Sequence, residues 1–264
     1  MNLSQWQAEC PGRLYAIIDA ALAPSAIGRF YETGGEDAFP LFAGTAFAEQ
    51  APQGPWLLPF PSTAFIDTYP QLCGFYIISE APVERVRNHW QSLIEVAYEG
   101  EVMWLRFADQ RVFPNMLGTM SQSELDEVLG PCAGLWANGE TWFRSHDAEF
   151  TPRQAPWFRI HPHHLAALYD ESRHAYILRR RLWQTMPAMM ERHSDPAAAI
   201  PPILQQANLD GLDGAVRDGV VAGGLTRQAD MPMAAIRTPM LLTLNELAQA
   251  ASWLDKNNEL IGVP

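Results

Sequence analysis

The spacing of apolar and polar residues changes along the chain, and each spacing predicts one type of element. The run RLYAIIDA, from Arg13 to Ala20, stays apolar until Asp19 and predicts a buried strand. CGFYIISE, from Cys73 to Glu80, is rich in aromatic and β-branched residues and predicts another strand. Between them, Pro24 and Gly34 bracket a helix. The pieces FPLFAGT and GPWLLPF, which Gly and Pro interrupt, predict short strands or extended loops.

The clearest helix is predicted from Pro82 to Gly100. Its apolar residues recur at intervals of three or four and form one stripe, which consists of Val83, Val86, Trp90, Leu93, Ile94 and Ala97. Gly100 is expected to end this helix. His89 lies next to the stripe, and we interpret it as a residue at the boundary of the core rather than as a ligand.

The next segment, MWLRFADQRVF, places three charged residues in an apolar run. We predict a strand from Glu101 to Asp109, with Arg106 at the end of a mostly apolar face. A guanidinium group there needs a carboxylate, which Asp109 or Asp19 would supply, and removing one partner of a buried pair would cost ~3–5 kcal/mol. A structural clasp and a site for chemistry or for a partner both remain open, and they involve the same side chains: Asp19, Arg106, Asp109 and Arg111.

The segment SQSELDEVLG carries clear helix signals at both ends. Ser121 and Glu124 have the spacing of a capping box, and Gly130 is expected to end the helix. GPCAGLW and TWFR then predict two closing strands. Strands therefore alternate with helices up to about residue 145, which is typical of an α/β fold, and we expect a mixed sheet.

The character of the chain changes after this region. SHDAEFTPRQAP is polar, contains two prolines and is interpreted as a linker. Beyond it, the pattern from His164 to His193 predicts one long helix, bent near Pro187, and several shorter helices follow. We therefore expect an α/β lobe over residues 1–145 and an all-α lobe over residues 146–264.

Charge narrows the range of partners. The net charge is −12, and residues 1–160 contain 19 Asp and Glu against 9 Arg. Phosphate backbones and anionic membranes would be repelled, so we expect neither nucleic acid nor membrane as a partner. A basic protein surface would be attracted, although an acidic surface also serves solubility alone.

The sequence also bears on location and on cysteine chemistry. No run of about 18 apolar residues occurs, and the first residues lack a basic start followed by an apolar core, so we predict a cytoplasmic protein. Cys10, Cys73 and Cys132 lie far apart in no metal-binding pattern, and we expect reduced, mostly buried thiols.

Motifs of known catalytic chemistry are scarce. GxSxG, P-loop, GxGxxG and HExxH patterns do not occur. The cluster HPHH contains His161, His163 and His164, but no further ligand of suitable spacing lies nearby, so we predict no metal and interpret these residues as the start of a helix. A metal-dependent hydrolase that uses His161, His163 and Asp19 stays an alternative. Arg179 to Arg181 are interpreted as a solvated basic face.

Six short segments of the first half follow one another in the order of a known family. They are LYAIIDA, FPLFAGT, GPWLLPF, PVERVRNHWQSLIEV, WLRFADQRVF and LGPCAGLW, between residues 13 and 137. With these segments the chain resembles the domain of unknown function 4123 family, whose members act as adaptor chaperones for type VI secretion effectors in Gram-negative bacteria. WLRFADQRVF is the most specific of the six, although Gln110 stands where the family often has Pro.

The resemblance implies a protein that binds rather than catalyses and that needs no cofactor. Such a protein holds a cognate toxin effector, often by the effector's N-terminal segment, and loads it onto the VgrG spike protein. The charged group at Asp19, Arg106, Asp109 and Arg111 would then be a structural clasp or part of a partner-binding groove. Further candidates for partner binding are Trp136, Trp142 and Trp157, since tryptophan suits interfaces. An immunity protein that neutralises a toxin is a second binding alternative.

Overall fold

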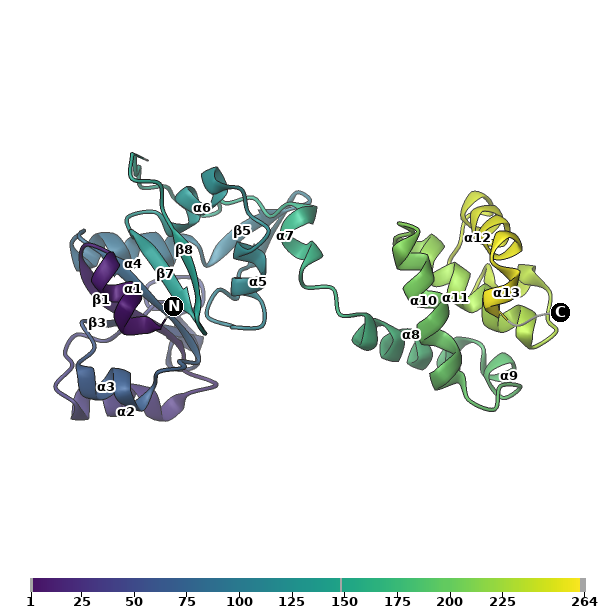
Figure 1. The fold of residues 1–264 in the computed structure, drawn as a ribbon, viewed down its shortest axis with the longest axis horizontal. Helices are drawn as coiled ribbons and strands as arrows, with labels where there is room; N and C mark the ends of the chain where they lie inside the picture. Colours follow the sequence, from purple (N-terminus) through teal and green to yellow (C-terminus); the bar gives the residue numbers. More distant parts are fainter. Residues whose placement is uncertain (1, 148, 262–264) are drawn as a thin grey trace. The chain divides into compact units, whose positions relative to one another are not determined.

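The computed structural model describes residues 2–147 and 149–261. The chain forms two compact units, Met1–Leu168 and Tyr169–Pro264, which we describe separately (Figure 1). The first unit combines a β-sheet with helices and the second is helical, so the predicted fold class is confirmed, with a sheet whose paired strands are antiparallel where a mixed sheet was expected. Among the described residues, no helix combines the length and apolar character needed to cross a membrane.

A six-stranded sheet forms the centre of the first unit. Its order is β2-β3-β1-β4-β7-β8, and each pair of neighbouring strands is antiparallel. β1 lies in the interior of the sheet, between β3 and β4. The strands are β1 (Arg13–Asp19), β2 (Phe39–Pro40), β3 (Pro55–Pro59), β4 (Gly74–Ser79), β7 (Gly134–Ala137) and β8 (Glu140–Phe143).

Both faces of this sheet are buried, which explains why the interior positions of β1 and β4 are apolar. Along β1 the side chains alternate: Tyr15 and Ile17 enter one core, whereas Leu14, Ala16 and Ile18 enter the other. The first core also receives side chains of α4, α5 and α6, and the second receives those of α1, α2 and α3. These helices are α1 (Leu3–Glu9), α2 (Pro24–Glu32), α3 (Thr63–Thr68), α4 (Val83–Ser92), α5 (Phe113–Leu117) and α6 (Gln122–Leu129).

A β-hairpin replaces the second half of the long predicted helix. α4 ends at Ser92, and β5 (Glu95–Tyr98) pairs with β6 (Glu101–Trp104) in a separate two-stranded sheet. The helix prediction to Gly100 is therefore wrong, because Glu99 and Gly100 adopt positive φ of 49° and 87° and form a hairpin turn. The strand predicted from Glu101 to Asp109 also ends early, at Trp104, where the chain curls into α5.

The first unit extends to Leu168, beyond the boundary predicted at residue 145. The reason lies in the segment after the polar stretch. Phe158 and Ile160 are buried in the core, and the backbone of Ala97 in β5 donates to Phe158 and accepts from Ile160, each at 2.9 Å. α7 (Pro162–Ala166) then completes this unit.

The second unit is built from helices that pack in chain order. α8 packs against α10, α10 against α11, and α11 against α12. The single long helix predicted from His164 to His193 is wrong, because the Asp170 side chain accepts a hydrogen bond from the Arg173 backbone and starts a new helix there. The helices are α8 (Glu171–Thr185), α9 (Pro187–Met190), α10 (Pro196–Leu209), α11 (Gly214–Gln228), α12 (Leu244–Lys256) and α13 (Asn258–Ile261). Each unit also contains a short 3₁₀ helix, η1 (Ala48–Gln53) in the first and η2 (Met233–Ile236) in the second.

His89 is buried and tied to the end of a neighbouring helix, contrary to its predicted boundary position. Its Nε2 donates to the carbonyl of Val128 at 2.7 Å, and burial lowers the pKa of His89 to about 4. Gly130 ends α6 with a φ of 57°, and a Cβ atom at that position would lie 2.3 Å from the His89 ring. Only glycine fits here, since both the backbone conformation and the space exclude a side chain.

We predict that Gly130→Ala lowers the free energy of unfolding by at least about 1–2 kcal/mol, the cost of left-handed backbone for an ordinary residue, with a further loss from the displaced His89 ring. Urea unfolding followed by tryptophan fluorescence measures this. Gly118→Ala is the matched control, because Gly118 has a φ of −64° and its nearest contact would be 3.5 Å. We expect that variant to be neutral or slightly stabilised. Equal stabilities of the two variants would contradict the assignment.

Candidate functional site

The four charged residues singled out in the sequence meet, in part, at the corner between β6 and α5. Asp109 is 2% exposed, and its carboxylate receives the Arg111 backbone N–H at 3.0 Å and two guanidinium bonds from the same residue at 3.0 and 2.8 Å. Arg106 Nη2 lies 3.0 Å from Asp109 Oδ2. The backbone carbonyl of Asp109 accepts from Val112 and Phe113 and starts the α5 turn. We call Arg106, Asp109 and Arg111 the clasp.

The clasp is buried only at its carboxylate. The Arg106 and Arg111 side chains are 52% and 74% exposed, so their charges remain in contact with water. Hydrogen bonds from Arg111, followed by the charges of both arginines, lower the pKa of Asp109 against the opposing effect of burial. Removing one arginine is therefore expected to cost less than the ~3–5 kcal/mol of a fully buried pair, since the other arginine still pairs with the buried Asp109 carboxylate.

Asp19 lies near the clasp without joining it. It ends β1, and its carboxylate accepts the backbone N–H of Ala21 at 3.0 Å, as a residue that shapes a turn does. Its negative charge raises the pKa of Arg111 further, after the larger effect of Asp109. The carboxylate partner of Arg106 is Asp109.

A pocket of about 280 Å³ lies between these groups and the end of the hairpin. Its polar wall consists of Asp19, Arg106 and Asp109, and apolar atoms form most of the rest. The remaining lining residues are Ala21, Gln53, Gly54, Pro55, Trp104, Leu105, Phe107 and Ala108. This volume lies at the lower end of the range for small-molecule sites and is large enough for one side chain of a partner.

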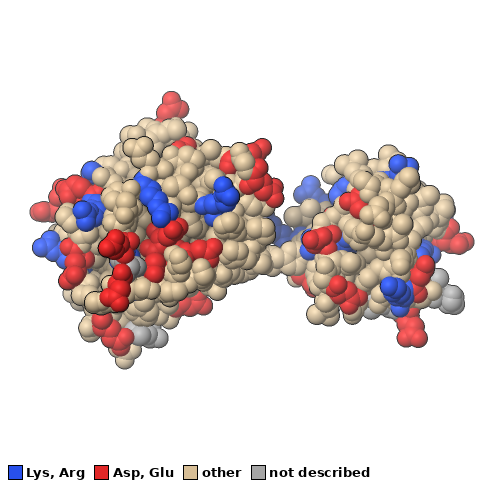
Figure 2. All heavy atoms as spheres, turned by 90° about the horizontal axis from the view of Figure 1, so that it is seen from above, with Lys and Arg blue, Asp and Glu red and all other residues tan. Residues whose placement is uncertain are grey.

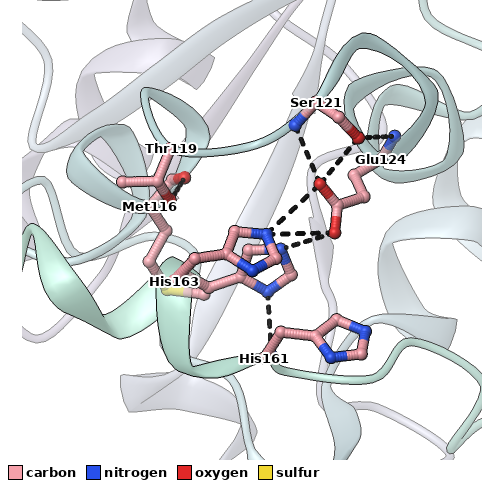
Figure 3. Close-up of polar contacts among 7 residues, drawn as sticks. Met116, Thr119, Ser121, Glu124, His161 and His163 are labelled. Atoms are coloured by element: carbon pink, nitrogen blue, oxygen red, sulfur yellow. Dashed lines mark hydrogen bonds and ion pairs between the residues drawn. The ribbon is translucent and has the colours of Figure 1, made fainter.

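A second polar group joins α7 to the start of α6 (Figure 3). Glu124 accepts from the Ser121 backbone at 2.8 Å and from its hydroxyl at 2.7 Å, which completes the predicted capping box. The other Glu124 oxygen lies 3.0 Å from Nε2 of the fully buried His164 and 3.2 Å from Nε2 of His163. Burial alone would raise the pKa of Glu124, but these hydrogen bonds outweigh it and lower the pKa to about 2.

Glu124, His163 and His164 are close enough to be considered as metal ligands, and no local sequence signal predicted that Glu124 would join the histidines. The hydrogen bonds favour a different role. Nδ1 of His164 accepts the backbone N–H of His161 at 3.1 Å, so in the neutral ring Nε2 carries the proton and donates it to Glu124. In that arrangement Nε2 of His164 has no lone pair for a cation, so the hydrogen bonds of His164 favour a structural role over metal binding.

The hydrolase alternative also fails to assemble its residues. Asp19 lies in the pocket beside the clasp, whereas the possible metal-ligand group among the described residues contains Glu124 with His163 and His164. The ring of His161 stacks on that of His163 with centroids 5.6 Å apart. Cys132 is fully buried, and burial raises its pKa to about 12, which suits a structural thiol.

The three tryptophans predicted as partner-binding residues occupy different environments. Trp136 is 5% exposed and packs against Tyr76 in the core, so its indole is not available at the surface. Trp142 is half-buried on β8. Trp157 is half-buried as well, and its Nε1 donates to the Ser92 hydroxyl at 2.9 Å.

The structure exposes other large apolar side chains instead. In the first unit Val102, Met103 and Trp104 of β6 are 58%, 48% and 49% exposed. In the second unit Tyr176 and Ile177 of α8 are about half exposed, and Arg181 of the predicted basic face lies 3.8 Å from Asp218 of α11. The sequence prediction included a strand from Glu101 but assigned its partner β5 to the preceding helix, although Glu99 and Gly100 between two short runs are the signal of a hairpin.

Comparison with known proteins supports a family for the first unit. Residues 14–127 match the model of a family described as Domain of unknown function (DUF4123). The matched region runs from β1 into α6 and contains the clasp and Glu124. No curated protein and no solved structure matches the chain.

We predict that Asp109→Asn lowers the free energy of unfolding at pH 7 by about 1.5–3 kcal/mol, the range for hydrogen bonds to charged groups. The folded-state pKa of Asp109 is lowered, so its contribution is complete above the unfolded pKa, about 3.9, and is lost as pH falls through the folded pKa. The difference between wild type and variant should therefore shrink below pH 4 in urea titrations.

The control for this prediction is Asp147→Asn, because the Asp147 side chain is fully exposed. The free energy of unfolding of Asp147→Asn should equal that of wild type at pH 7 and at pH 3. A difference between wild type and Asp109→Asn that stays the same from pH 7 to pH 3 would show that the ionised carboxylate is not the stabilising species.

We predict that Glu124→Gln increases backbone amide exchange in residues 158–168, because it weakens the hydrogen bond to His164 that holds α7. Hydrogen exchange followed by mass spectrometry measures this. Glu246→Gln is the matched control, since Glu246 closes the same kind of capping box on Thr243 and bonds to no histidine in the part of the chain that the structure describes. That control should leave residues 158–168 unchanged. Equal exchange in wild type and Glu124→Gln would remove the role assigned to the histidine contact.

Proposed function

We propose that this protein is an adaptor chaperone of a type VI secretion system, which binds a toxin effector in the cytoplasm and loads it onto the VgrG spike. The match of residues 14–127 to DUF4123 carries the proposal, because that region contains five of the six segments by which the chain resembles the adaptor family. The effector's N-terminal segment is the part we expect this protein to hold. The protein itself performs no catalysis under this proposal.

The geometry of the clasp supports a binding role over an enzymatic one. A general acid or base must present its titrating group to a substrate. The Asp109 carboxylate is instead buried, accepts three hydrogen bonds from Arg111, and has a lowered pKa. It is suited to fixing a corner of the chain, and the arginine side chains that pair with it remain 52% and 74% exposed.

The surface of the protein also supports partner binding. Large apolar side chains are exposed in both units, and three of them, Val102, Met103 and Trp104, are consecutive on β6, where exposed apolar surface is typical of a protein interaction site. Acidic side chains are prominent on the face of the first unit seen in Figure 2, with arginines among them. Such a surface favours a partner with a basic region and would speed their association.

We expect that deletion of the gene for this protein abolishes secretion of one toxin while other type VI effectors are still secreted. Secretion of the toxin encoded beside the gene is measured first, by immunoblot of cells and culture medium. A tagged chain should retain both that toxin and VgrG from cell extracts. Expression of the wild-type chain from a plasmid should restore secretion, because loading is the step that it performs.

Two outcomes would contradict the proposal. If the toxin stays stable and is secreted normally without this protein, the adaptor role is wrong. If the protein protects cells from the toxin without affecting its secretion, the immunity alternative takes its place. Elemental analysis of the purified protein completes the comparison, since a stoichiometric metal ion would revive the hydrolase alternative.

A further inference from the structure

The outer edge of β6 carries backbone groups that point away from its partner strand. The Leu105 N–H donates to the Ile94 carbonyl at 2.9 Å. Hydrogen-bonded positions alternate along an antiparallel pair, so in the register of β5 and β6 the backbone groups of Met103 and Glu101 also face β5. The N–H and C=O groups of Val102 and Trp104 therefore point outwards. No backbone or side-chain group of the described residues bonds to them.

The opposite edge of this small sheet is already covered. Ala97 lies across from Val102 in β5, and its N–H and C=O bond to Phe158 and Ile160. The hairpin thus has one closed edge and one open edge. An open edge is a template for pairing with another extended chain, and proteins usually protect it with charges, prolines or bulges.

β6 lacks that protection along most of its length. Val102, Met103 and Trp104 are consecutive, apolar and each about half exposed, so both faces of the strand present apolar surface. The Trp104 ring is held in place from one side, with centroids 5.2 Å from Phe42 and 5.9 Å from Phe47. The packed Trp104 ring therefore offers an apolar surface against which a side chain of a partner can pack.

The pocket of about 280 Å³ beside the clasp continues from the end of the same strand, since Trp104, Leu105 and Arg106 line it. A chain paired along β6 would reach the lining of this pocket at Trp104. Its mostly apolar lining suits one large apolar side chain, and backbone pairing combined with side-chain pockets is how strand addition gains specificity.

Charge indicates the chemistry of the visiting segment. Residues 95–104 contain Glu95, Glu99 and Glu101 and neither Lys nor Arg. Asp19 lies in the pocket, and Arg106, which also lines it, is already paired with Asp109. A second copy of this chain would bring the same glutamates and would be repelled. A segment with Lys or Arg at positions facing these carboxylates would be attracted.

We propose that β6 binds an extended segment of the partner protein, which adds a third strand to the β5–β6 sheet. The segment alternates apolar residues with Lys or Arg and inserts one large apolar side chain into the pocket beside the clasp. This inference rests on the proposed adaptor function, because the toxin supplies the segment.

Proline substitution tests the backbone contribution. Val102→Pro removes an outward N–H while keeping the inward bonds to β5, and edge positions of this kind tolerate proline. Thr141→Pro is the matched control: Arg144 N–H bonds to Ala133, so in the register of β7 and β8 the Thr141 N–H also points outwards from an edge strand. We expect Val102→Pro to reduce retention of the neighbouring toxin at least tenfold, and Thr141→Pro to retain it as wild type does.

Charge reversal gives a second test that does not alter the backbone. Glu101→Lys should weaken toxin retention at low salt, whereas Glu140→Lys, at an exposed position of β8, should not. Circular dichroism and thermal unfolding check that all four variants fold. Because Glu101→Lys keeps every backbone hydrogen bond, it tests the β6 site even if Val102→Pro unfolds.

The outcomes separate this inference from the function on which it rests. If wild type and all four variants retain the toxin equally, the β6 site is wrong and the adaptor function stands. If wild type retains no toxin, both the β6 site and the adaptor function are wrong. If wild type forms a dimer in sedimentation experiments and Val102→Pro is monomeric, the edge serves a second copy of this chain and the proposed partner segment is wrong.

Discussion

A buried carboxylate at the end of the β5–β6 hairpin sets the strictest requirement on the first unit. Asp109 is shielded from water, so its oxygens must find their hydrogen bonds within the chain. Its donors, Arg106 and Arg111, lie on both sides of it in the sequence, and the backbone has to curl around it. This curl turns the chain from exposed β6 into buried α5 and shapes the adjoining pocket.

The end of the first unit depends on a similar polar contact, made over a long distance in the sequence. Glu124 caps α6 and also accepts from His164, while Phe158 and Ile160 enter the core beside β5. Each contact is modest alone. Together they explain why the segment after the polar stretch folds with the sheet and why the first unit extends to Leu168.

How far the sequence predicted the structure depended on whether the signal was local. β1 and α6 are where the apolar run of Arg13 to Ala20 and the capping box at Ser121 place them. The hairpin was missed because Leu93, Ile94 and Ala97 fit helical spacing, and only the turn at Glu99 breaks the pattern. Arg106 and Asp109 could be paired by proximity in the chain, whereas the contact of Glu124 with His164 depends on the tertiary fold.

An open strand edge recognises another chain through hydrogen bonds that every residue except proline can make. Discrimination between clients would then rest on the few side chains around the pocket and on the glutamates of the hairpin. Related proteins could exchange one client for another through substitutions at those positions, with the sheet left as it is. Divergence of specificity would leave little trace in the core and would be concentrated around β6.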